Sequence, residues 1–379
     1  MTTTTFDHLP HTARSHFLLL MYGAVYRLLY TVHLLDSAAD GKPALQEDFP
    51  FLAGYFDEMV RYMPADVTWE AGWRWWNAQL AQWEAGQDEL PLLRLAMPAQ
   101  DAPPAAAWDG LDQRLALVLI GLVEEDSRFG TVFARLQEPL PGRRPVVELV
   151  GRVIRGGSDD GLDVQALCAR LVAAGLVEVI NPEAARVEWA LRVPAEVWDA
   201  VRGDPPGQRS GWVYQSGEQL PAVGQLVASA DFLARLRQAP AVLQSGKADT
   251  LILRGTAGAD RVRAMGAVAR ALGKAMLVVE GAGLAERTPR SLGPVCAMID
   301  ALPVVSFDLT PGETAALPEL GVYRGALGVI LGAEGGLSGK RAESALTLRM
   351  PLLKAAQRLQ CWRDALGEDS PDLPLIAER

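Results

Sequence analysis

A strand, a Gly-rich turn and a helix follow one another from Thr250, and this order constrains the fold more than any other feature of the sequence. The segment reads TLILRG from Thr250 to Gly255, then TAGADRVRA from Thr256 to Ala264, then MGAVARALG. Backbone N–H groups of such a turn, together with the N-terminus of the following helix, form a cradle for phosphate groups. The segment therefore predicts a phosphate-loop-like turn in an α/β domain.

The turn keeps glycines of a phosphate loop but lacks its reactive side chains. On the pattern G-x-x-G-x-G-K-[ST], Gly255 and Gly258 match, whereas Asp260, Arg261 and Val262 replace the last Gly, the Lys and the Ser/Thr. A carboxylate at Asp260 repels a phosphate, and Val262 offers no oxygen to Mg²⁺. The other interpretation is that Asp260 begins the helix, where a carboxylate stabilises the free N–H groups. Both interpretations place the protein's own carboxylate in the anion position.

Apolar strands and helices alternate along the rest of this region, as they do in a parallel sheet. The pattern predicts strands over residues 251–255, 275–281, 303–309, 326–334 and 345–351. Helices are predicted over 230–238, 261–272 and 291–302, and a closing helix over 354–366.

Residues 1–100 predict a helical region rich in aromatic side chains. The run from Phe17 to Leu35 is apolar, but Arg27 and His33 interrupt it, which favours a buried or partner-facing helix over a membrane span. A second helix carries a stripe of large side chains, and core packing is favoured over a docking face for it. The stripe consists of Trp69, Trp73, Trp76, Leu80 and Trp83.

Residues 108–202 predict helices followed by a winged-helix domain. Two amphipathic helices are expected between Gly110 and Ile154, separated by an acidic turn at Glu124–Asp126. A helix, a strand, an Asn-Pro turn and a second strand follow, and residues 181–184 are the expected tip of the wing. Eight Arg stand against nine Asp and Glu from 143 to 202, which argues against duplex DNA binding and favours a protein-docking or spacer role.

Composition excludes several other classes. A formal net charge of −10 argues against a general binder of nucleic acids or anionic membranes. Cys168, Cys296 and Cys361 are far apart, so they predict neither a disulfide framework nor a CxxC metal site, and they fit a reducing cytoplasm. All four histidines lie in the first 33 residues, which leaves the α/β region without a His-based triad or metal cluster. His8, His11 and His16 are interpreted as part of a solvated tail, with a shared metal as the alternative.

The chain also resembles the N-terminal half of a bacterial AAA+ family whose members carry a helical N-terminal region, a winged-helix domain and then AAA modules. The similar segments are LALVLIGLVEEDSRFGTVFARLQEPLPGRRPVVELVGRVI, LVAAGLVEVI with LRVPAEVWDAV, and LILRG with the later LGKAMLVVEG. The resemblance implies a helical region over 1–100, a helical plus winged-helix domain over 108–202, and a degenerate first AAA module with a truncated lid over 212–379.

A working module of this kind would end its third strand in four hydrophobic residues followed by Asp and Glu. The Asp holds Mg²⁺ and the Glu polarises water. The segment PVVSFDL supplies Asp308 but has Leu309 at the Glu position, and the polar sensor position falls near Ala333 and Glu334. The implied nucleotide site is degenerate, and neither ATP nor Mg²⁺ is expected as a cofactor. Its residues are Gly255, Gly258, Asp260, Arg261, Val262 and Asp308.

These observations together predict a cytoplasmic regulatory or scaffold portion of an AAA+ ATPase that acts in protein remodelling or assembly. Its expected partners are other AAA modules or subunits of a ring. Neither a specific nucleic acid nor a membrane is expected as a partner. The alternatives are an active ATPase that binds ATP·Mg²⁺ through an atypical loop, and a winged-helix DNA-binding protein. A second Gly-Lys pair, Gly339 and Lys340, fits the phosphate-loop pattern poorly because Glu334 and Arg341 replace its first Gly and its Ser/Thr.

Overall fold

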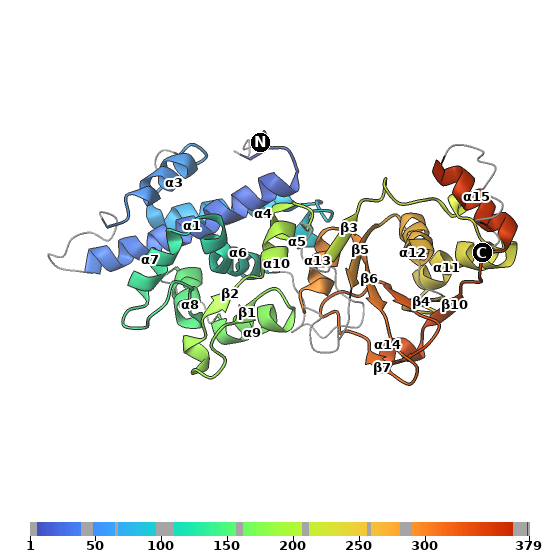
Figure 1. Cartoon of the computed structure of the whole chain (residues 1–379). Helices are drawn as coiled ribbons and strands as arrows, with labels where there is room; N and C mark the ends of the chain where they lie inside the picture. The colour runs from blue at the N-terminus through green and yellow to red at the C-terminus, as the bar shows by residue number, and fades with distance from the viewer. Residues whose placement is uncertain are drawn as a thin grey trace. The chain divides into compact units, whose positions relative to one another are not determined.

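The computed structural model describes residues 6–38, 48–64, 67–95, 110–156, 162–206, 212–255, 259–280, 290–366 and 377. The chain divides into two compact units, Met1–Pro205 and Pro206–Arg379 (Figure 1). The first unit is mainly helical, and the second is built on a mostly parallel sheet. The protein is therefore of the mixed α/β class that the sequence predicted.

The first unit is organised around one long apolar helix, α1 (Ala13–Ala38). Helices α4 (Trp69–Glu84) and α6 (Leu111–Glu125) pack along it, and α3 (Phe51–Val60) contacts it as well. By length and composition alone α1 could span a membrane, but 72% of its most apolar window is buried inside the protein. Its burial identifies α1 as a core helix of this unit, in agreement with the sequence-based preference.

Arg27 shows how α1 tolerates a charge in its apolar run. Its Nη1 donates to the carbonyl oxygen of Ile154 at 2.6 Å, and its Nη2 lies 2.9 Å from Asp112 Oδ1. Arg27 as a whole is only 2% exposed, and a charge so deeply buried requires both kinds of partner. Arg27 therefore connects α1 to α6 and to α8 (Val147–Arg155).

The interpretation of the N-terminal histidines as a solvated tail holds for His8 and His11, which are exposed, but is wrong for His16. Phe6 is fully buried and His16 is only 2% exposed, with its Nε2 2.7 Å from Glu84 Oε1. The ring of His11 stacks on Trp83 at a centroid distance of 4.5 Å. The aromatic face of α4 supplies the apolar surface that holds this segment, and that surface exists only after folding.

The tryptophan stripe of α4 is mostly core, as predicted. Trp76, Leu80 and Trp83 are buried, while Trp69 and Trp73 are half-buried. The helix begins after Thr68, whose hydroxyl accepts a hydrogen bond from the N–H of Ala71 at 3.3 Å, as N-cap residues commonly do.

The segment from 110 to 155 forms three helices, whereas the sequence predicted two. They are α6, α7 (Phe129–Leu136) and α8. Pro139, Pro141 and Gly142 lie between α7 and α8, and Gly142 has a φ of +130°. Proline lacks the N–H that a helix interior needs, and this φ is unfavourable for other residues, so no helix continues through this stretch.

Two helices and a short hairpin follow in the predicted order. Helix α8 precedes α9 (Val164–Ala173), and strands β1 (Glu178–Val179) and β2 (Leu191–Arg192) pair antiparallel. Asn181 closes the hairpin, because its Oδ1 accepts from the N–H of Ala190 at 2.6 Å. Helix α10 (Ala195–Arg202) ends the unit and packs closely on α6, since a Cβ at Gly121 would lie 2.2 Å from the ring of Trp198.

The second unit contains a six-stranded sheet in the order β10-β4-β8-β6-β5-β3. Five strands run parallel, and the edge strand β3 runs antiparallel to β5. The bounds are β3 Trp212–Gln215, β4 Thr250–Arg254, β5 Ala275–Glu280, β6 Ala301–Phe307, β8 Leu327–Leu331 and β10 Leu346–Arg349. Helices α11 (Ala230–Gln244) and α12 (Ala259–Ala271) share a buried apolar cluster with these strands.

All five parallel strands were predicted, but their ends and three further strands were not. Strand β6 begins two residues before the expected position, and α13 (Leu292–Met298) ends correspondingly early. Strand β3 was missed, as were β7 (Thr314–Ala316) and β9 (Gly336–Ser338), which pair with each other in parallel. These segments are short and only partly buried, so they lack a periodic apolar pattern. The chain also forms α14 (Lys340–Glu343) and α15 (Ala355–Leu366).

Candidate functional site

The turn after β4 begins at Gly255, at the carboxyl edge of the sheet. The N–H of Gly255 donates to the carbonyl oxygen of Leu331 at 3.2 Å, which continues the ladder between β4 and β8. A Cβ at this position would lie 3.2 Å from Met350 Cβ and 3.6 Å from Arg261 Cδ. Glycine therefore suits a position where the start of α12 and the residue after β10 both approach the backbone. Gly258, the second matching glycine, lies outside the described residues.

The first turn of α12 carries the substituted residues of the phosphate-loop pattern. Asp260 is half-buried, and the positive end of the helix dipole favours its carboxylate there. Val262 is half-buried against the apolar cluster shared by α11, α12 and the sheet. An aliphatic side chain committed to the core cannot coordinate a cation.

Arg261 carries buried nitrogen atoms with free hydrogen-bonding capacity in the described structure. Its Nε and Nη1 are buried and have no hydrogen-bond partner among the described residues. Its aliphatic stem lies beside Gly255, as the contact to Cδ shows. A guanidinium group can pair with an anion, but it does not reproduce the compact contact of a Lys ammonium.

Asp308 lies directly after β6 and is exposed. No hydrogen bond or ion pair joins its carboxylate to another described residue. Leu309 is half-buried against Gly335, since a Cβ on that glycine would lie 2.5 Å from Leu309 Cβ. Ala333 and Glu334, at the expected sensor position, are both exposed. The position that the resemblance assigns to a catalytic carboxylate is thus occupied by Leu309, which makes an apolar packing contact.

The sheet order brings some of these residues to one edge and separates others. The first of the five parallel strands, β4, lies between β8 and β10, and β8 separates β4 from β6, which Asp308 follows. Gly255 and Leu331 are in contact across β4 and β8. In a parallel sheet all these strand ends meet at the carboxyl edge, where α/β proteins bind ligands.

Sequence reasoning missed Arg254, the last residue of β4. Its Nη1 donates to the carbonyl oxygen of Gly335 at 3.1 Å, so it connects the end of β4 to the turn that follows β8. An arginine at the end of an apolar strand was the only available signal, and it does not reveal a partner 81 positions away.

Other chemistry has little support in the described residues. They contain no cluster of three or more His, Cys, Asp and Glu side chains suited to a metal ion. Burial raises the pKa of the Cys168 thiol to about 12 and also raises that of Cys296, which disfavours a nucleophilic thiolate at either position. Lys340 begins the four-residue helix α14 after β9, outside the main sheet, and is exposed.

The described structure is that of a two-unit, mixed α/β protein whose second unit has a mostly parallel sheet. No protein-family model matches the chain, and no curated protein matches it.

Proposed function

We propose that this chain is a regulatory or scaffold portion of an AAA+ ATPase, in which the second unit is a degenerate module without ATPase activity. The sequence resemblance suggests the family. The strand, turn and helix at the carboxyl edge of a parallel sheet support the proposal, because this is the arrangement in which a phosphate site is built. Its proposed role is in protein remodelling or assembly in the cytoplasm.

The observation that carries the proposal is the commitment of Val262 and Leu309 to apolar packing. Val262 contacts the core cluster and Leu309 contacts Gly335, so the Mg²⁺-binding oxygen and the water-polarising carboxylate are both replaced by structural contacts. Both functional oxygens are therefore missing, one in the helix that follows β4 and one directly after β6. This is a larger change than the replacement of a single loop residue. The proposed partners are therefore other AAA modules or ring subunits that supply hydrolysis.

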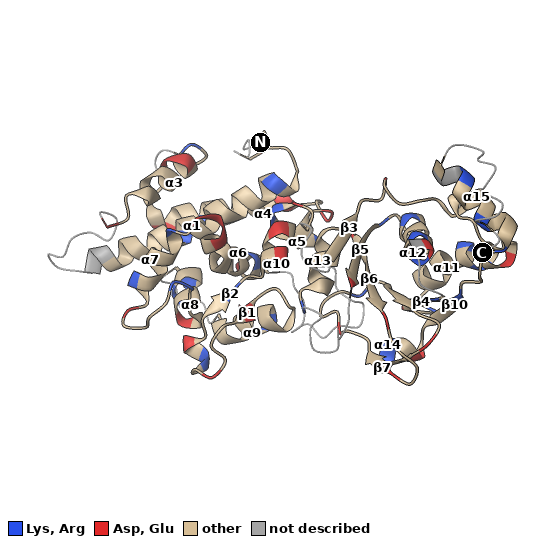
Figure 2. Ribbon diagram, in the orientation of Figure 1, with Lys and Arg blue, Asp and Glu red and all other residues tan. Residues whose placement is uncertain are grey.

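The first unit fits a docking or spacer module within this proposal. The order α8, α9, β1, β2 is that of a winged helix, and the exposed positions of α9 include Gln165, Ala169 and Ala173. Ribbon segments coloured for acidic and basic residues both occur around α9 and the hairpin (Figure 2), and Arg192 is paired with Glu178. Duplex DNA binding depends on cations that neutralise phosphates, so this surface gives little support to the DNA-binding alternative.

Calorimetry with ATP·Mg²⁺ tests the proposal. The wild-type chain is expected to show no micromolar binding, and the triple variant Asp260→Gly, Arg261→Lys, Val262→Thr is expected to gain affinity. Arg263→Lys, an exposed change in the same helix, serves as the control and should leave binding unchanged. Micromolar, magnesium-dependent binding by the wild-type chain would contradict the proposal and favour an active ATPase with an atypical loop.

A further inference from the structure

Residues 6–12 form a short irregular segment ahead of α1, and one buried side chain anchors this segment to the first unit. Phe6 is fully buried. Its ring makes edge-to-face contacts, at centroid distances of 5.0, 6.0 and 6.2 Å, with the rings of Trp76, Trp75 and Tyr62. Such contacts add to the free energy gained by burying an aromatic ring. We use the name strap for residues 6–12 and the name Phe6 pocket for the three rings.

The rest of the strap is held by few contacts. Two exposed histidines, His8 and His11, stack on aromatic rings. The carbonyl oxygen of Leu9 accepts a hydrogen bond from Trp83 Nε1, which is long at 3.4 Å. Phe6 is therefore the main anchor, and burial of one such side chain favours the docked strap by roughly 10- to 150-fold.

The Phe6 pocket is built by elements other than the strap. Trp76 is fixed by a hydrogen bond from its Nε1 to the carbonyl oxygen of Leu19 in α1, at 3.0 Å. Trp75 lies in the same helix, α4. Tyr62 follows α3, and its N–H donates to the carbonyl oxygen of Met59 at 3.0 Å. The walls keep these partners when the strap leaves, so the pocket is pre-formed for an aromatic side chain.

We propose that the Phe6 pocket is a docking site for an aromatic-anchored segment, filled in this structure by the chain's own strap, and that the strap of a second copy replaces it. A second copy offers identical side chains, so exchange of the strap reproduces every contact and requires no new interface. An isolated chain keeps the contact within itself because its own strap is always close by, and exchange is confined to copies held side by side. The inference rests on the proposed function only in taking those copies as neighbouring subunits of a ring.

A synthetic peptide of residues 6–12, with photo-leucine in place of Leu9, tests the docking site. The Phe6→Ala chain lacks the anchor of its own strap, so cross-linking of the peptide to α4 should be about tenfold or more above that of the wild-type chain. A peptide with Ala at the position of Phe6 should label neither chain. Pro10→Ala is the control variant, since Pro10 is exposed and the anchor is kept, and its labelling should equal that of the wild-type chain. Equal labelling of the wild-type and Phe6→Ala chains would overturn the proposal.

Competition by a full chain tests the second copy as the occupant. The Trp75→Ala chain has an intact strap and a damaged pocket, so it should compete for the Phe6→Ala chain as well as the unlabelled peptide does. The double variant Phe6→Ala, Trp75→Ala has no anchor and should not compete. Competition by the unlabelled peptide without competition by the Trp75→Ala chain would refute a second copy as the source of the segment.

If Phe6→Ala fails to fold, amide exchange in the wild-type chain decides. A strap that leaves while α4 stays folded lets the N–H of Leu9 exchange about tenfold or more faster than that of Leu80, which is fully buried within α4. Equal exchange rates would mean that the strap leaves only when the whole unit unfolds, which rules out exchange between folded copies. None of these measurements uses a nucleotide, so this proposal and the proposed lack of ATP binding can fail separately.

Discussion

At the scale of single residues, the first unit depends on a few buried charges that bond across helices. Glu84 accepts from Arg114 at 2.6 Å through one carboxylate oxygen and contacts His16 through the other. The three side chains are each less than a tenth exposed. Sequence reasoning treated His16 as part of a tail because its partner lies 68 positions away, and no local pattern reports such a pairing.

Replacing Glu84 with Leu is expected to lower the free energy of unfolding by about 3–5 kcal/mol, because it leaves Arg114 buried without its carboxylate. Glu70→Leu is the control in the same helix, since Glu70 forms an exposed pair with Arg74 and its loss should cost less than about 1 kcal/mol. Urea unfolding followed by circular dichroism measures both variants. If both variants lowered the free energy of unfolding by the same small amount, the buried carboxylate of Glu84 would add no more to stability than the exposed one of Glu70.

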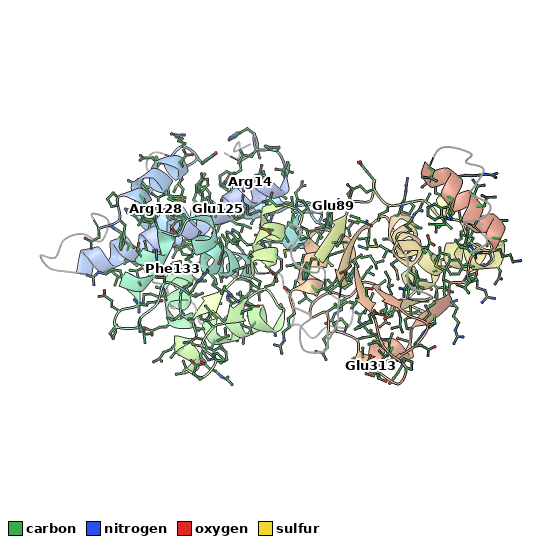
Figure 3. All side chains as sticks on the ribbon, viewed as in Figure 1. Arg14, Glu89, Glu125, Arg128, Phe133 and Glu313 are labelled. Carbon is green, nitrogen blue, oxygen red and sulfur yellow. The ribbon has the colours of Figure 1, made fainter. Side chains whose placement is uncertain are left out.

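At the scale of elements, the attachment of α3 illustrates how an aromatic and a charged contact combine. Tyr55 donates to Asp126 Oδ2 at 3.3 Å, and the guanidinium of Arg128 bonds the same carboxylate while lying 4.6 Å from the ring centroid of Phe51. Arg128 is labelled in Figure 3. Burial, followed by the charge of Asp126, raises the pKa of Tyr55 to about 12, and the hydrogen bonds from Arg128 lower the pKa of Asp126.

The raised pKa of Tyr55 predicts a loss of stability in alkali. Between the ordinary pKa of 10.0 and about 12 the unfolded chain has released the phenol proton and the folded chain retains it, so stability falls as pH rises through this range. In urea titrations at several pH values, Tyr55→Phe should decrease this dependence by one proton. Asp126→Asn should keep most of it, because burial is the larger cause. An equal effect of both variants would identify the charge of Asp126 as the main cause.

The elements also show where sequence patterns fail. Four of the five parallel strands, β4, β5, β6 and β8, were predictable because each is a run of mostly buried apolar residues. Residues 111–155 form three helices, and the sequence predicted two, although Pro139 and Pro141 indicate a break between helices. Strands β7 and β9 were not predictable, because three-residue segments acquire strand geometry only from each other.

At the scale of the whole molecule, each unit has its own core, and no complete nucleotide site is described in either. AAA modules act as rings because one subunit's arginine completes its neighbour's site, so a module without its own chemistry contributes surface alone. Under the proposed function, the apolar side chains at Val262 and Leu309 would make this chain dependent on other modules for turnover.

The chain by itself is accordingly expected to be monomeric or loosely associated and to release no phosphate from ATP. Multi-angle light scattering combined with a phosphate-release assay on residues 1–379 measures both properties. A stable hexamer with ATPase activity would contradict the scaffold proposal.

The sequence by itself determined the α/β class, the parallel strands and the loss of reactive side chains, because periodicity and residue identity are local properties. Tertiary structure alone decided the strand order, the burial of His16 against Glu84, and the contact between Arg254 and Gly335. The partners in these contacts lie 68 and 81 positions apart. Long-range pairs are selected by the packing of the whole unit, so these contacts could be identified only once the elements were in place.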